Sequence, residues 1–180
     1  LSYLYRSLIL LIFRPTNLIV KSSLPLDKDI DTLWRECSPS KGFSLIRDSK
    51  YYNYRYRDHP LEKYNHHAFY IDGKLECMLT TCIKADSNGN NLIVICDYLK
   101  NNKISFLYVL NYIVESHAHL SVLKYNFWCE EYGQDFMSAM FSGFIGGSSV
   151  PIIFRESKKT LVLAAPSLKM DFHIGSSDNV

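Results

Sequence analysis

The sequence lacks the features that mark several protein classes. Lys and Arg number 20 against 18 Asp and Glu, so bulk charge predicts neither nucleic acid nor an anionic membrane as a partner. No Walker loop, dinucleotide-binding fingerprint, Ser-His-Asp order or internal repeat is present. The chain does have 180 residues with a hydrophobic fraction of 47%, which indicates one folded domain with a substantial core.

The cysteines and histidines are scattered rather than clustered. His66 and His67 are adjacent and His117 and His119 are two apart, and neither spacing brings two rings to one side of a strand or helix. We therefore predict no metal site. None of the cysteines forms a Cys-x-x-Cys pair, and their odd number favours a reducing compartment, which we take to be cytoplasmic. The five are Cys37, Cys77, Cys82, Cys96 and Cys129.

No apolar run near the N-terminus is long enough to cross a membrane. Residues 8–13 are apolar but lie between Arg6 and Arg14, and a membrane-spanning helix needs about 20 residues. No small-residue cleavage site follows the run. We expect residues 1–13 to form a helix that Pro15 ends. Residues 1–26 then serve as a linker helix and connector to a missing upstream region, which would make the chain a fragment.

Two short helices are expected at the start of the following domain. Asp27 or Asp29 offers an N-cap for the first helix, because a carboxylate can accept a hydrogen bond from the backbone of the first turn. The segment 38–42 ends this helix. Ser49 offers an N-cap for a second helix over residues 50–57.

The clearest strand signal is a β-hairpin. Residues 65–71 and 74–84 have strand character, and Asp72-Gly73 joins them with residues that adopt the positive φ angles of a type I′ turn. A strand–helix–strand unit follows, and its first strand, residues 92–97, is a continuous apolar run typical of a strand buried on both faces. Its helix and second strand are expected at residues 103–120 and 122–130, and together the three form a right-handed parallel crossover. Further along, a helix is expected at 134–142 and strands at 150–155, 160–165 and 169–174.

This order predicts a mixed α/β fold, in which helices flank a central mixed sheet. With Gly143-Phe144 closing the helix after the second parallel strand, it resembles the GNAT superfamily of acyl-CoA-dependent N-acyltransferases. Residues 47–60, Arg-Asp-Ser-Lys-Tyr-Tyr-Asn-Tyr-Arg-Tyr-Arg-Asp-His-Pro, are similar to the R-D-x-x-Y-L-N-W-R-Y-x-x-H-P stretch in the second lobe of two-lobed GNAT-like proteins. The resemblance makes residues 27–180 a GNAT-like domain and implies an upstream GNAT-like lobe as a partner.

The resemblance also implies a co-substrate site. In this superfamily acetyl-CoA or another acyl-CoA lies where two parallel strands splay apart, here residues 92–98 and 122–130. The turn after the first strand, residues 99–104, would receive the pyrophosphate at the helix N-terminus. The acceptor would be a small-molecule amine or amino sugar. The residues implied to contact the co-substrate are Cys96, Asp97, Tyr98, Leu99, Lys100, Asn101, Asn102 and Lys103.

Two features depart from the superfamily pattern. Active members place an Arg/Gln-x-x-Gly-x-Gly/Ala loop at the phosphate turn, but residues 99–104 contain no glycine. The tyrosine that often protonates the CoA thiolate is replaced by Ala139. A non-catalytic lobe, which supports an upstream catalytic lobe or binds a protein, therefore stays open beside an active acyltransferase.

Candidate catalytic groups follow from the chemistry of acyl transfer, which needs a base for the ammonium proton. Glu130 and Glu131 lie at the carboxyl end of the second parallel strand, where α/β sheets place ligands, but they could equally be solvated acids. Asp97 ends the first parallel strand, so it could orient an amine or close an Asx turn. Tyr98 or Tyr132 could replace the missing acid.

One segment has the composition of a nucleic-acid-binding surface. Residues 51–57 interleave tyrosines with basic side chains, a pattern that can stack bases and contact phosphates. Acidic neighbours dilute the charge, and helical spacing spreads the side chains over several faces. Core packing, with Arg55 in an ion pair, is the simpler interpretation, so nucleic acid is an unlikely partner.

Overall fold

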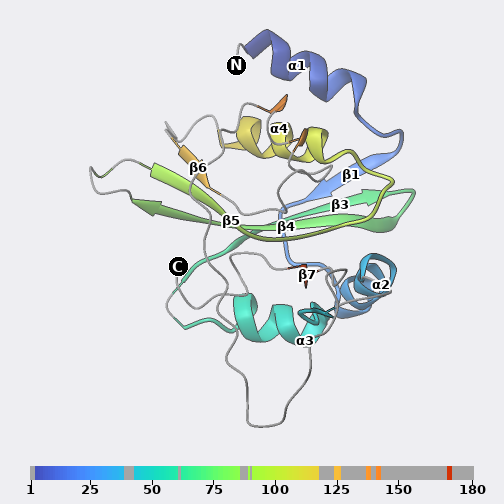
Figure 1. The fold of residues 1–180 in the computed structure, drawn as a ribbon, viewed down its shortest axis with the longest axis vertical. Helices are drawn as coiled ribbons and strands as arrows, with labels where there is room; N and C mark the ends of the chain where they lie inside the picture. The colour runs from blue at the N-terminus through green and yellow to red at the C-terminus, as the bar shows by residue number, and fades with distance from the viewer. Residues whose placement is uncertain are drawn as a thin grey trace.

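A five-stranded sheet with the order β1-β3-β4-β5-β6 forms the centre of the computed structural model (Figure 1). The structure describes residues 3–38, 43–60, 62–85, 89, 91–117, 124–126, 137–138, 141–142 and 170–171. β6 runs parallel to β5, and the other neighbouring strands are antiparallel. The strands are β1 (Leu18–Lys21), β3 (Asn65–Ile71), β4 (Lys74–Ala85), β5 (Asn91–Lys100) and β6 (Lys124–Asn126). The predicted mixed α/β fold is confirmed.

The predicted hairpin is confirmed at its turn. β3 and β4 pair through Ile71 and Lys74, and the two residues between them have positive φ angles, 51° at Asp72 and 79° at Gly73. Positive φ at both central residues is the signature of a type I′ turn, whose twist matches that of the flanking strands.

The two strands of the strand–helix–strand unit are parallel, as predicted. β5 pairs with β6 from Leu92 opposite Lys124 to Val94 opposite Asn126, and α4 (Phe106–Ser116) lies between them in the chain. The predicted helix, residues 103–120, contains α4. The predicted opening between the two strands stays a prediction, because residues 127–130 lie outside the described part of the chain.

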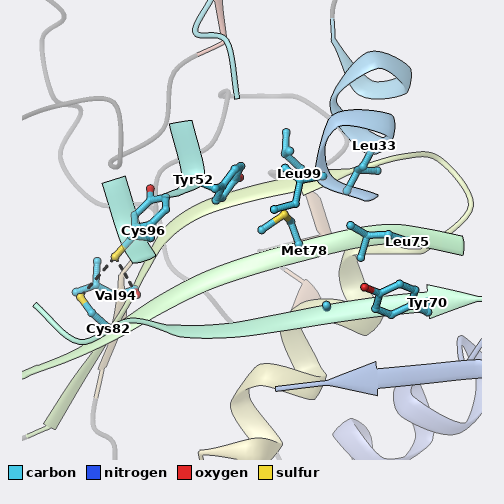
Figure 2. Packing of buried hydrophobic residues seen from close by; sticks show 12 residues of the cluster. Leu33, Tyr52, Tyr70, Leu75, Met78, Cys82, Val94, Cys96 and Leu99 are labelled. Carbon is cyan, nitrogen blue, oxygen red and sulfur yellow. Dashed lines mark hydrogen bonds between the residues drawn. The ribbon is translucent and has the colours of Figure 1, made fainter. Parts of the chain in front are cut away.

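Helices cover both faces of the sheet (Figure 1). α1 (Tyr3–Ile12) and α4 lie on one face; α2 (Asp27–Cys37), α3 (Ser49–Tyr52) and the π-helical turn η1 (Asn53–Arg57) lie on the other. Each face has its own apolar cluster. Figure 2 shows the cluster on the α2 and α3 face, where Leu33, Tyr52 and Met78 pack together. Among the described residues, no helix is long and apolar enough to cross a membrane.

The helix N-caps differ from the predicted ones. Leu26 is the N-cap of α2 and makes no side-chain hydrogen bond, while Asp27 and Asp29 lie in the first turn. Their carboxylates therefore act on the helix dipole rather than as caps. At α3 the N-cap is Asp48, not Ser49, and its carboxylate accepts a hydrogen bond from the Tyr51 backbone N–H at 3.0 Å.

Three short strands fall where sequence patterns are weak. Residues 18–21, placed in the connector by sequence, form β1 on the edge of the sheet beside β3. β2 (Phe43–Ser44) pairs in parallel with β7 (Met170–Asp171) in a separate two-stranded sheet. Of the strand expected at 169–174, the described residues 170 and 171 form a strand, and they belong to this separate sheet. The strands expected at 150–155 and 160–165 lie outside the described residues; in the helix expected at 134–142, the described residues 137–138 and 141 are helical.

Candidate active site

The candidate site is built on a β-bulge in β5. Thr81 of β4 pairs with Ile95, but the preceding residue, Thr80, pairs with Asp97, so Cys96 is an extra residue between them. A bulge turns two successive side chains toward the same face of a sheet. Cys96 accordingly packs in the cluster on the α2 and α3 face, and Asp97 is directed to the same side.

Asp97 and Arg47 form a buried ion pair at this bulge. Arg47 Nε lies 3.8 Å from Asp97 Oδ1, and each residue is only 1% exposed. Tyr56 donates its hydroxyl hydrogen to Asp97 Oδ2 at 3.2 Å, and Arg47 Nη1 donates to the Tyr98 carbonyl oxygen at 3.4 Å. The prediction that Asp97 ends its strand is wrong, because β5 continues to Lys100. Asp97 is a buried carboxylate inside the sheet.

Three tyrosines surround this carboxylate. Tyr52 and Tyr56 are buried, and the ring of Tyr51 packs edge-on against both, with centroids 5.3 and 5.9 Å away. Burial, followed by the nearby charge of Asp97, raises the pKa of the Tyr56 hydroxyl, and the same two causes raise the pKa of Tyr51. The Tyr51 and Tyr56 hydroxyl oxygens are 3.5 Å apart. These hydroxyls therefore stay protonated and can donate hydrogen bonds.

The expected phosphate turn is shorter than predicted. Leu99 and Lys100 belong to β5, where they pair with Met78 and Cys77, so the turn itself covers residues 101–105. The Asn101 backbone N–H donates to the Glu76 carbonyl oxygen at 3.0 Å, and the Lys103 backbone N–H donates to Asn101 Oδ1 at 2.8 Å. This Asx-type bond gives the turn a defined shape without glycine.

Charge at this turn is partly neutralised from within the protein. Lys103 Nζ lies 3.2 Å from Oε1 of Glu76, whose side chain is buried, while the Lys103 side chain is largely exposed. Asn102 is exposed, and Ser105 is the N-cap of α4 and makes no side-chain capping bond. The turn thus combines a helix N-terminus, which favours anions, with a cation that a buried carboxylate already holds.

The other predicted contacts divide between the two faces of β5. Tyr98 stacks on Phe106 at the start of α4, with ring centroids 4.6 Å apart. On the opposite face, the Cys96 sulfur lies 3.5 Å from the Cys82 sulfur, and both thiols are free (Figure 2). Leu99 is buried in the core, so its side chain is not available to a ligand.

Several predicted site residues cannot be placed beside this cluster. Glu130, Glu131, Tyr132, Ala139 and the pair Gly143-Phe144 lie outside the described residues. Within the part of the chain that is described, no group of three His, Cys, Asp or Glu side chains could hold a metal ion.

Sequence reasoning did not connect Arg47 with Asp97. Arg47 is the first residue of the Arg-Asp…His-Pro segment. That segment indicated that Arg47 is important, but it did not indicate which residue Arg47 contacts. Other members of that segment have structural contacts: Asp48 caps α3, and Arg57 Nη2 pairs with Asp27 Oδ1 at 3.4 Å. The core interpretation is confirmed for Tyr52 and Tyr56.

Comparison with solved structures identifies the fold. No protein-family model matches the sequence, and a search of curated proteins found no match. Glucosamine-6-phosphate N-acetyltransferase from Arabidopsis thaliana is similar in structure, with a TM-score of 0.54 and 10% identity over 77% of this chain and 99% of that one. An aminoglycoside acetyltransferase from an uncultured soil metagenomic sample, solved with sisomicin, also has a TM-score of 0.54, with 14% identity over 79% and 97% of the two chains. The chain therefore has the GNAT fold of acyl-CoA-dependent N-acetyltransferases.

Proposed function

We propose that this protein is a cytoplasmic acyltransferase that transfers an acyl group, most simply acetyl, from acyl-CoA to the amine of a small acceptor. The observation that carries the proposal is the β5–α4 unit. In this unit the bulge at Cys96 places the Asp97 carboxylate on the α2 and α3 face of the sheet, and β5 leads into the N-terminus of α4. The structural neighbours include acetyltransferases named for glucosamine 6-phosphate and for aminoglycosides, which supports an amino-sugar acceptor.

The chemistry assigns a role to the carboxylate. The amine nitrogen attacks the thioester carbonyl carbon, the carbon–sulfur bond breaks, CoA leaves as the thiolate, and the ammonium proton passes to a base. Asp97 would hold the amine or accept that proton, and the hydrogen bonds from Tyr56 and on to Tyr51 would link it to the half-exposed edge of the cluster. Glu130 and Glu131 are proposed as alternative bases.

The turn after β5 would receive the CoA pyrophosphate. The first backbone N–H groups of α4 have no acceptors within the helix, and the helix dipole favours an anion there. Lys100 and Lys103 would add positive charge. The phosphates must compete with Glu76 for Lys103, since that pair is already formed at 3.2 Å. Glu76→Gln should therefore tighten acetyl-CoA binding.

A binding and turnover measurement tests the proposal. Millimolar acetyl-CoA should raise the melting temperature by binding the folded state selectively. Acetylated product and CoA are then followed by chromatography with a panel of amino sugars and aminoglycosides. Asp97→Asn should abolish turnover, and Asp72→Asn, in the hairpin turn, should retain it. Absence of a shift with any acyl-CoA would count against the proposal.

One observation favours a second candidate, a non-catalytic lobe that supports an upstream catalytic lobe or binds a protein. Asp97 is paired with Arg47, accepts a hydrogen bond from Tyr56 and is 1% exposed, which fits a structural role in the core. This alternative predicts that the wild-type chain forms no acetylated product with any acceptor of the panel, and that Asp97→Asn lowers the melting temperature.

Nucleic-acid binding has less support. Tyr52 and Tyr56 are buried, and Tyr54, at 82% exposure, is the one fully exposed ring of residues 51–57. A single exposed ring is a poor stacking platform. Salt-sensitive binding to oligonucleotides at low ionic strength would be needed to revive this interpretation.

A further inference from the structure

The outer face of α1 is apolar and exposed. Leu4, Leu8 and Leu11 are 79%, 52% and 77% exposed, and they recur at the spacing that puts side chains in one stripe along a helix. Ile12 and Phe13 extend the same apolar surface at its end. Single exposed leucines are ordinary on protein surfaces, but a continuous stripe of them indicates a binding surface.

The inner face of the same helix is already used by the fold. Ile9 is 4% exposed and Leu10 is half-buried against the cluster beneath α4, on the side where α1 lies over α4 (Figure 1). The helix is therefore apolar on both sides, whereas a surface helix normally has a polar outer side. Packing within the domain accounts for the inner side and leaves the outer side unexplained.

Charge around α1 identifies the kind of surface that fits. Residues 1–26 contain Arg6, Arg14 and Lys21 and no Asp or Glu, so they carry +3. The other residues hold 17 Lys and Arg against 18 Asp and Glu, a net −1 (20 − 3 and 18 − 0). Arg14 is exposed where the apolar stripe ends. Lys21 lies over the Tyr70 ring on the α2 and α3 face of the sheet, so the positive charge near the stripe comes from Arg6 on α1 and from Arg14.

We propose that α1 lies flat on an anionic lipid surface, with its leucine stripe in the acyl–headgroup boundary and Arg14 against the headgroups. A helix that binds in this way has an apolar face together with basic residues, and attraction to anionic lipid adds to the burial of apolar area. At ten residues, about 15 Å, α1 rests on a membrane and is too short to span it.

A second copy of the chain fits this face less well. The apolar surface consists of five residues, whereas a specific protein interface uses about 20–30 residues on each partner. Pairing two copies would also bring two Arg14 side chains and no acidic partner from this segment together. A lipid surface has no minimum contact area and supplies the missing negative charge.

Vesicle co-sedimentation of the intact chain tests the proposal. The protein should bind vesicles of phosphatidylcholine with 30% phosphatidylglycerol and bind pure phosphatidylcholine much more weakly, and 0.5 M salt should reduce the difference, because exposed charges are screened. The triple variant Leu4→Ser/Leu8→Ser/Leu11→Ser should lose about tenfold in affinity or more. Arg14→Glu should lose about tenfold on anionic vesicles alone. Ile46→Ser removes an equally exposed apolar side chain elsewhere and should bind normally.

The contrary outcomes are equally specific. If the wild-type chain leaves anionic vesicles in the supernatant, or binds both vesicle types equally, the proposal is wrong. It is also wrong if sedimentation velocity without lipid shows a dimer that the triple variant loses. The replaced leucines are exposed, so unchanged circular dichroism and melting temperature should show that the variants remain folded.

Discussion

Replacing Arg47 with Met should destabilise the protein strongly. At 3.8 Å, and with an effective dielectric constant of about 20, the attraction between Arg47 and Asp97 is about 4 kcal/mol. Both side chains are almost completely buried, so removing one partner leaves the other charge uncompensated in the core. Losses of about 3–5 kcal/mol are typical of that situation. Asp97 would keep the hydrogen bond from Tyr56, which places the expected loss at the lower end of this range.

Urea unfolding, followed by circular dichroism, measures this loss. The double variant Arg47→Met/Asp97→Leu should recover much of the stability, because it removes both charges instead of leaving one alone. Arg57→Met is the matched control: Arg57 pairs with Asp27 at 3.4 Å, but both side chains are about half exposed, so the loss should be below about 1 kcal/mol. If Arg47→Met costs no more than Arg57→Met, the buried pair described here does not exist in solution.

Three further predictions concern single residues. Burial lowers the pKa of His67 to about 4 from an ordinary 6.5, so below pH 6.5 the unfolded chain takes up a proton that the folded chain excludes. The free energy of unfolding should therefore fall as the pH drops below 6.5, by about 2 kcal/mol for this residue at pH 5. Urea titrations at several pH values should show that His67→Phe removes this part of the pH dependence. Asp48→Ala should cost about 1 kcal/mol in the same assay by removing the α3 cap, while Ser49→Ala should cost less. Gly73→Ala should cost about 1 kcal/mol through its positive φ alone, since no atom lies within 4 Å of the added methyl group.

Elements with strong local signals could be predicted from the sequence. The hairpin follows from Asp72-Gly73 between two strand-like runs, and β5 and α4 follow from their apolar patterns. β1 could not be predicted, because four residues in an apolar segment carry no clear period and its strand conformation depends on pairing with β3. The α3 cap was misplaced by one residue, since two adjacent capping residues, Asp48 and Ser49, compete for the same position. The α2 cap was not predicted, because Leu26 has no side-chain acceptor that would mark it.

The candidate site needed three-dimensional information. A cysteine at position 96 does not signal a β-bulge, yet the bulge decides on which face of the sheet the Asp97 side chain lies. Arg47 is 50 residues away in the chain, and only the fold brings the two charges together. Position on β5 could therefore be predicted for Asp97, but its burial, its partner and its distance from the strand end could not.

The short strand β1 has a consequence for any attempt to produce this domain alone. A polypeptide that starts at residue 27, where helical structure resumes, would lack β1. The four residues of β1, ending with Lys21 opposite Ala68, pair with β3 in the complete chain. The backbone donors and acceptors on that border of the sheet would then be open to another chain. Such a truncated preparation should aggregate, or exchange segments between molecules, even though every residue of the GNAT-like resemblance is retained.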